Sequence, residues 1–270
     1  MLGQDLVATA PTDVEVYSFS RAALDITDPA AVELSVRDVR PNVMINAAAY
    51  TKVDQAESEP AVAFRVNAEA VGALGRVAKE AGSRLVHFST DYVFDGTSDA
   101  PYGEDTPTSP VNVYGSSKLA GELALRQSGV DHLIVRTQWL FGVHGRSFPR
   151  TMWERGRAHS ITSVVNDQRG RPTYTRHLAR TVWALCQREV RGLMNVANAG
   201  DATWFDVASR VFATVGASTL LRACTTADFP TRARRPSYSV LCTNRLESHT
   251  GLALPHWHDA LDEFLQSLRS

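Results

Sequence analysis

The segment Arg84-Leu-Val-His-Phe-Ser-Thr90 decides the fold class of this chain. Its apolar, β-rich run predicts a buried strand, and a stretch of helical period, residues 116–126, follows it. Short runs of the same kind recur along the chain and alternate with longer helical stretches; they are Val14–Phe19, Val43–Asn46, His132–Thr137 and Leu193–Val196. This alternation is typical of parallel βαβ units, so we predict an α/β fold with a doubly wound parallel sheet.

The helical stretches indicate how the chain is divided. Apolar residues recur at helical spacing through Ala61–Ala81, and Asp28-Pro29 supplies an N-cap and first-turn proline for a helix up to Val39. After Gly142 the alternation loosens into Arg-rich loops and three further helices, predicted at Thr175–Arg188, Thr203–Val215 and His258–Leu268. We therefore expect a dinucleotide-binding domain over residues 1–150. Residues 151–270 are expected to form most of a smaller substrate-binding lobe, interleaved with the first.

Composition excludes several classes of protein. With 270 residues, 44% of them hydrophobic, and a net charge of −1, the chain can bury a full core but lacks the basic surplus of a nucleic-acid or membrane-surface binder. Its three cysteines have no metal-ligand spacing, so reduced thiols are expected and no metal site is predicted. The sequence has neither a long apolar run nor a signal-peptide core, so we expect a cytoplasmic protein.

Three residues predict the chemistry. Tyr114 and Lys118, spaced i and i+4 in Tyr-Gly-Ser-Ser-Lys, lie on one face of a helix, so the ammonium is expected to lower the pKa of the phenol. A tyrosine tuned in this way can donate a proton near neutral pH. Thr90, at the end of the predicted strand, is expected to hydrogen-bond the substrate oxygen.

Four blocks of the sequence are similar to those of a known family. Asn46-Ala-Ala-Ala-Tyr-Thr-Lys-Val-Asp54, Phe88-Ser-Thr-Asp-Tyr-Val-Phe-Asp-Gly96, Asn112-Val-Tyr-Gly-Ser-Ser-Lys-Leu-Ala-Gly-Glu122 and Arg136-Thr-Gln-Trp139 resemble the signatures of the dTDP-4-dehydrorhamnose reductases. These are extended short-chain dehydrogenases/reductases, and the resemblance continues through 167–172 and 234–239. It implies a Rossmann-like fold and hydride transfer from NADPH to the C4 ketone of dTDP-4-dehydro-L-rhamnose, which gives dTDP-L-rhamnose.

The resemblance also implies roles for individual residues. Tyr114 would protonate the ketone, Thr90 would orient it, and Lys118 would also hold the nicotinamide ribose. Asp91, Tyr92 and Trp139 would face the sugar, although Asp91 could instead cap a turn and the two aromatic residues could be core packing. Arg171 and Arg235 are candidates for the pyrophosphate because guanidinium groups match phosphate oxygens, with solvated surface arginine as the alternative.

The cofactor half departs from the family pattern in two places. Where an acidic residue often ends the second strand, this chain has Ser20 followed by Arg21, which favours NADPH over NADH. Asp25 and Ile26 are then expected against the adenine, and Ala47, Ala48, Ala49 and Thr51 beside the cofactor. Gly3 corresponds to the last glycine of the phosphate-binding turn, and we expect the first strand and two earlier glycines to be missing.

Two rival functions remain open. The same trio would serve a reductase of another nucleotide-linked ketosugar, and a non-catalytic regulatory subunit of this fold is a further alternative. The expected partner is a dTDP-linked ketosugar, without nucleic acid or membrane, and the fold also allows a homodimer.

Overall fold

The centre of the molecule is a parallel sheet. The computed structural model describes residues 1–158, 161–216 and 220–269. Four strands, β1 (Val43–Asn46), β2 (Arg84–Thr90), β3 (His132–Thr137) and β8 (Gly192–Asn195), pair in the order β1-β2-β3-β8. Thr90 lies opposite Thr137 in this register, so the carboxyl ends of the two central strands meet at one edge. The predicted α/β fold with a parallel sheet is confirmed.

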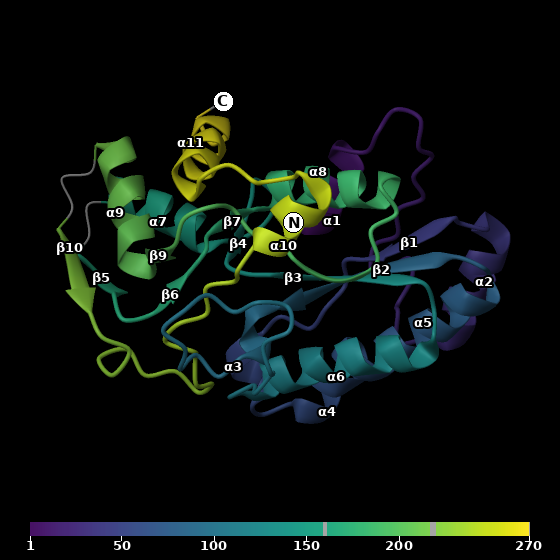
Figure 1. Cartoon of the computed structure of the whole chain (residues 1–270). Coiled ribbons are helices and arrows are strands. Elements are labelled where there is room, and N and C mark those ends of the chain that lie inside the picture. The colour runs from purple at the N-terminus through teal and green to yellow at the C-terminus, as the bar shows by residue number, and fades with distance from the viewer. Residues whose placement is uncertain (159–160, 217–219, 270) are drawn as a thin grey trace.

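One layer of helices covers the face of the sheet on which Leu85 and Ile134 are fully buried. It contains α2 (Pro29–Val39), α5 (Ala70–Glu80) and α6 (Val113–Ser128), as Figure 1 shows. A short helix α4 (Pro60–Phe64) and a π-helical turn η1 (Arg65–Glu69) run directly into α5, so the predicted helix Ala61–Ala81 is one interrupted helix. Asp28 caps α2 by accepting a hydrogen bond from the Ala31 amide, as predicted.

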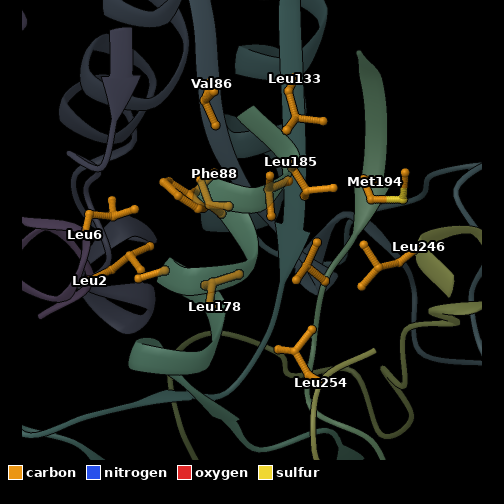
Figure 2. Close-up of a cluster of buried hydrophobic side chains, with 14 residues drawn as sticks. Leu2, Leu6, Val86, Phe88, Leu133, Leu178, Leu185, Met194, Leu246 and Leu254 are labelled. Atoms are coloured by element: carbon orange, nitrogen blue, oxygen red, sulfur yellow. The ribbon is translucent and has the colours of Figure 1, made fainter. Parts of the chain in front are cut away.

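The opposite face of the sheet is covered by α1 (Leu2–Ala8), α8 (Thr175–Gln187) and α10 (Asn244–Thr250). Side chains alternate along a strand, so Val86 and Phe88 of β2 point to this side. Figure 2 shows them beside leucines of α1 and α8, with Met194 of β8 in the same cluster. The sheet is therefore covered on both faces, as a doubly wound fold requires.

A second core lies beyond the sheet, in the part of the molecule that contains β5, β10 and α9 in Figure 1. Its helices are α7 (Phe148–Arg157), α9 (Trp204–Val215) and α11 (Trp257–Ser267). Three two-stranded pairs accompany them: β4 (Leu140–Phe141) with β7 (Thr173–Tyr174), β5 (Thr162–Val165) with β10 (Leu221–Cys224), and β6 (Arg169–Gly170) with β9 (Ala202–Thr203). Because α8 and β8 return to the first core between these elements, the two cores are interleaved along the chain. Among the described residues, no helix has both the length and the apolarity needed to cross a membrane.

One predicted strand is wrong. Residues 14–19 are described throughout, yet they form no strand and are exposed along their whole length. A strand is stabilised by hydrogen bonds to a neighbouring strand, and β1 pairs within the described sheet only with β2. The β-forming residues of this segment therefore have no neighbouring strand with which to pair. The sequence analysis also missed α7, which begins with a proline in its first turn inside the segment expected to be loop.

Candidate active site

The first catalytic candidate, Thr90, lies where β2 ends and a single 3-10 turn, η2 (Asp91–Val93), begins. Its hydroxyl accepts a hydrogen bond from the Tyr92 amide at 3.2 Å and donates one to the Asp91 carboxylate at 2.9 Å. The extended conformation of Thr90 and this capping contact fix the direction in which the chain leaves the sheet. Thr90, Asp91 and Tyr92 are thereby held together at the carboxyl edge.

Helix α6 brings Tyr114 to the same edge. Asn112 caps the helix by accepting a hydrogen bond from the Gly115 amide at 2.7 Å. A Cβ atom on Gly115 would collide with the carbonyl oxygen of Tyr92, so glycine is what lets α6 approach η2 this closely. The rings of Tyr114 and Tyr92 then meet edge to face, with their centroids 5.7 Å apart.

The electrostatics of Tyr114 differ from the sequence-based expectation. Burial and the Asp91 charge raise the pKa of Tyr114 to about 12, and the interaction with the Thr90 hydroxyl offsets only part of this rise. Lys118 was expected to lower the pKa of this phenol, and that expectation is wrong for this arrangement. The Lys118 Nζ instead donates to the Phe88 carbonyl at 2.6 Å and lies 3.2 Å from His87 Nε2.

Lys118 is itself an unusual lysine, since only 2% of it is exposed. Burial lowers the pKa of Lys118 to about 8, although the carboxylate of Glu122 acts in the opposite direction. Glu122 is in turn held by the Arg136 guanidinium through two hydrogen bonds, of 2.8 and 2.7 Å. The three predicted catalytic residues therefore come from one strand end and one helix face, as expected, but the pKa values of Tyr114 and Lys118 are shifted.

Two of the residues expected to face the sugar, Asp91 and Tyr92, extend this cluster. Asp91 is 2% exposed, and burial raises its pKa to about 7, with the nearby hydroxyls of Ser239 and Thr90 offsetting part of the rise. Burial also raises the pKa of Tyr92, whose hydroxyl contacts Arg235. A buried carboxyl with a pKa near neutrality can exchange a proton at physiological pH.

Arg235 is close to this cluster but already has a carboxylate partner. Its Nη1 and Nη2 donate to the two oxygens of Asp54 at 3.0 and 2.8 Å. The pKa of Asp54 is lowered by this contact. Arg235 is therefore fixed by an ion pair rather than free in solvent, which excludes the solvated-surface alternative.

Trp139 contacts the second core, and Arg171 lies between β6 and β7. Trp139 has a positive φ of 46° and stacks on Trp204 with ring centroids 3.5 Å apart. One face of its ring is thus covered by protein, although the residue is only partly buried. Arg171 donates to the Thr243 hydroxyl at 3.0 Å, and its buried Nε has no hydrogen-bond partner among the described atoms.

The residues expected to bind the cofactor fall into two groups. Ala47, Ala48, Ala49 and Thr51 follow β1 and are exposed at the carboxyl edge of the sheet. Gly3 of α1 is adjacent, since a Cβ atom on it would lie 3.7 Å from the Ala47 Cβ. Small exposed side chains at this edge fit a cofactor whose phosphates approach the backbone closely.

The second group lies in the exposed segment that follows residues 14–19. Ser20 accepts backbone hydrogen bonds within a turn, and Arg21 forms an exposed ion pair with Asp25 at 3.7 Å. Hydrogen bonds from Thr27 lower the pKa of Asp25. Ile26 is partly buried and packs against the core beneath α2. Here the structure links Arg21 with Asp25 but places neither on a strand end.

Several buried polar residues in and around the candidate site were missed by the sequence analysis. Asn67 of η1 ties the segment after β1 to α6, because its amide group bonds the Tyr50 backbone at 2.8 and 3.0 Å and the Ser117 hydroxyl at 2.9 Å. Asn46 and His87 are polar residues inside strand patterns, and Gln138 is 2% exposed with both amide atoms unpartnered among the described residues. A polar residue inside an otherwise apolar strand was the signal that could have found the first two.

Comparisons with known proteins agree with this geometry. The family described as "RmlD substrate binding domain" matches residues 1–270. The chain is 42% identical to the dTDP-4-dehydrorhamnose reductase of Salmonella typhimurium over 257 residues, covering 90% of this chain and 85% of that protein. It is also 42% identical to a probable dTDP-4,6-dihydroxy-2-methyloxan-3-one 4-ketoreductase of Streptomyces antibioticus, over 97% of this chain and 90% of the other. A crystal structure of the Bacillus anthracis dTDP-4-dehydrorhamnose reductase in complex with NADP superimposes with a TM-score of 0.96 at 35% identity, covering 98% of this chain and 95% of that one.

Proposed function

Because this chain belongs to the RmlD substrate-binding-domain family, we propose that it reduces the C4 ketone of dTDP-4-dehydro-L-rhamnose with NADPH. The product is dTDP-L-rhamnose, a precursor of cell-surface polysaccharides. The chain is an NADPH-dependent oxidoreductase. The single observation that carries this proposal is the convergence of Thr90, Tyr114 and Lys118 at the carboxyl edge of a parallel sheet.

Each of the three residues has a separate role in the reduction of the ketone. Tyr114 donates its phenolic proton to the ketone oxygen, and Thr90, whose hydroxyl interacts with the phenol, orients that oxygen. NADPH supplies the hydride when bound. A proton donor fixed at the reacting atom typically contributes about 10²–10⁴-fold in rate. Lys118, a buried donor, holds the ribose hydroxyls of the cofactor and so fixes the reacting partners in place.

Substrate recognition is assigned to the residues around this trio. Asp91 and Tyr92 meet the sugar beside Tyr114, and Trp139 covers it from the side of the second core. Arg235 and Arg171 receive the pyrophosphate. For Arg235, the ion pair with Asp54 sets its position before the substrate arrives.

The cofactor is held by a different set of residues, in α1, after β1 and in residues 20–26. Gly3 and the small residues Ala47, Ala48 and Ala49 allow close approach of the backbone, with Thr51 beside them. Ser20, Arg21, Asp25 and Ile26 contact the adenosine half, where Arg21 favours the 2′-phosphate of NADPH. In this proposal residues 1–150 form most of the cofactor domain and residues 151–270 most of the substrate lobe.

A second substrate is favoured by one specific finding. The Streptomyces relative, named for a different dTDP-linked ketosugar, is as similar to this chain as the Salmonella reductase is. The trio acts on the ketone and not on the substituents around it. The choice between these sugars therefore depends on the residues that line the sugar, such as Asp91 and Trp139.

A substrate panel tests the proposal. NADPH absorbance is followed with dTDP-4-dehydro-L-rhamnose and with other dTDP-linked 4-ketosugars, using Tyr114→Phe as the matched control. We expect the highest kcat/KM with dTDP-4-dehydro-L-rhamnose. Faster reduction of another ketosugar would assign the second substrate. Absence of NADPH oxidation with every sugar, together with co-purification of a protein partner, would favour a regulatory subunit instead.

A further inference from the structure

Two buried polar side chains, Asn46 and His87, are linked to Lys118 by close contacts, and the proposed mechanism does not use them. Asn46 at the end of β1 and His87 in the middle of β2 are opposite each other in the register of the sheet. Asn46 is 7% exposed and His87 is fully buried. Buried polar groups are almost always paired, so the direction of each hydrogen bond here can be worked out from its partners.

The backbone fixes the orientation of Asn46. Its Oδ1 accepts a hydrogen bond from the Ala48 amide at 3.1 Å. The amide nitrogen Nδ2 must then be the atom that lies 3.2 Å from His87 Nδ1. Because Nδ2 can only donate, His87 Nδ1 must be an acceptor and carries no proton.

The proton of His87 therefore sits on the other ring nitrogen. Burial lowers the pKa of His87 well below its ordinary value, and Nδ1 accepts a hydrogen bond, so the ring is neutral and carries one proton. That proton is on Nε2, which lies 3.2 Å from Lys118 Nζ. An ammonium group has only hydrogens to offer, so two donors would face each other across this contact.

An uncharged amine removes the conflict, because its lone pair accepts the Nε2 proton while its own hydrogens still reach the Phe88 carbonyl. We propose that His87 is a positioning residue for Lys118: Asn46 fixes its tautomer, and its Nε2–H donates to the lysine nitrogen and favours the uncharged amine over the ammonium. Lys118 then changes its protonation state within reach of neutral pH. The consequence for catalysis rests on the proposed function, but the protonation state itself does not.

The other charges around Lys118 do not account for this state. Glu122, on the same helix, favours the ammonium, but Arg136 of β3 neutralises it through two hydrogen bonds. Asp91 of η2 acts on Tyr114 and Tyr92. Two factors oppose a positive charge on the amine of Lys118. One is burial, and the other is the contact with His87. Burial by itself lowers the pKa of Lys118 to about 8, and the contact with His87 acts in the same direction.

The small number of lysines makes a direct measurement practical. The sequence contains three, Lys52, Lys79 and Lys118, and the first two are exposed and serve as internal references. Protein with 13C at lysine Cε and 15N in the histidine rings is titrated by NMR without substrate or cofactor. We expect Lys118 to titrate well below Lys52 and Lys79, and His87 to keep its proton on Nε2 over the titration. Titration of Lys118 together with the two references, or a His87 proton on Nδ1, would overturn the proposal.

Two variants test the direction of the effect. Asn46→Leu removes the donor that fixes the tautomer without adding charge, so His87 Nε2 becomes free to accept and the Lys118 midpoint should rise by about one pH unit. His87→Gln, the matched control, retains an N–H donor at the position of Nε2 and should leave the midpoint low. An unchanged midpoint in folded Asn46→Leu would contradict the inference. Because the measurement needs no turnover, its failure is distinguishable from failure of the proposed function.

Discussion

At the scale of single residues, Tyr114 and Asp91 are two buried acids whose pKa values are both raised. Burial and the charge of Asp91 raise the pKa of Tyr114, so in the proposed mechanism the phenol keeps its proton until the substrate oxygen takes it. Tyr114→Phe removes that proton and keeps the ring that packs against Tyr92. We expect kcat to fall by about 10²–10⁴-fold with NADPH affinity nearly unchanged. Steady-state rates and an NADPH binding titration check this, and turnover close to wild type would refute the role of Tyr114.

The Asp91 carboxyl also predicts how stability depends on pH. Its pKa rises from 3.8 to about 7 on folding, so between these values the folded state binds more protons than the unfolded state. Stability contributed by the neutral carboxyl is therefore present at low pH and is lost as the pH rises toward 7. Asp91→Asn, which stays neutral, should be more stable than the parent at pH 8 by up to about 4 kcal/mol and equal to it near pH 4. Urea unfolding of both proteins at pH 4 and pH 8 tests this prediction. An equal gain in stability at the two pH values would show that the charge of Asp91 is not the cause.

The meeting of Thr90, Tyr114 and Lys118 could be predicted from the sequence because two local rules place these residues. A strand end positions Thr90, and helical spacing puts Tyr114 and Lys118 on one face. The charge state of Lys118 could not be predicted, because it depends on contacts with His87, 31 residues away, and on the pairing of His87 with Asn46, 41 residues away. Such pairings follow from sheet register, which a single sequence does not specify.

At the scale of elements, the packing of α6 against η2 holds the site together. Gly115→Ala would press a methyl group against the Tyr92 carbonyl, so α6 must move and carry Tyr114 with it. We expect a loss of about 1–3 kcal/mol in the free energy of unfolding and a larger proportional loss in kcat. Gly103→Ala is the control, since its added Cβ would meet its nearest neighbour at 3.7 Å. Equal unfolding midpoints and rates in the two variants would show that this close approach does not position Tyr114.

Helices with strong end signals were predictable, whereas isolated β-rich segments were not. Asp28-Pro29 begins α2 as predicted, and Thr203 begins α9 with a capping box in which Asp206 reciprocates. By contrast, Val14–Phe19 has β-forming residues but no strand beside it, since strand formation depends on a neighbour that local sequence cannot supply.

At the scale of the whole molecule, the interleaved chain makes the two cores interdependent. Helix α8 covers Val86 and Leu133 with side chains that are fully buried, although α8 lies beyond residue 150. A fragment of residues 1–150 would expose this face of the sheet to water. We expect it to aggregate or to lack a cooperative thermal transition, which circular dichroism would show against the full chain. A cooperative transition in the fragment would mean that the first core is complete without α8 and β8.

The measurement that tests the central claim most directly follows the transferred hydrogen. The enzyme is supplied with dTDP-4-dehydro-L-rhamnose and with NADPH deuterated at C4 of the nicotinamide, one face at a time. We predict dTDP-L-rhamnose with deuterium at C4 of the sugar from one of the two labelled cofactors, and about 10²–10⁴-fold slower labelling with Tyr114→Phe. Oxidation of NADPH that leaves no deuterium at C4 of the sugar from either labelled cofactor would contradict the account.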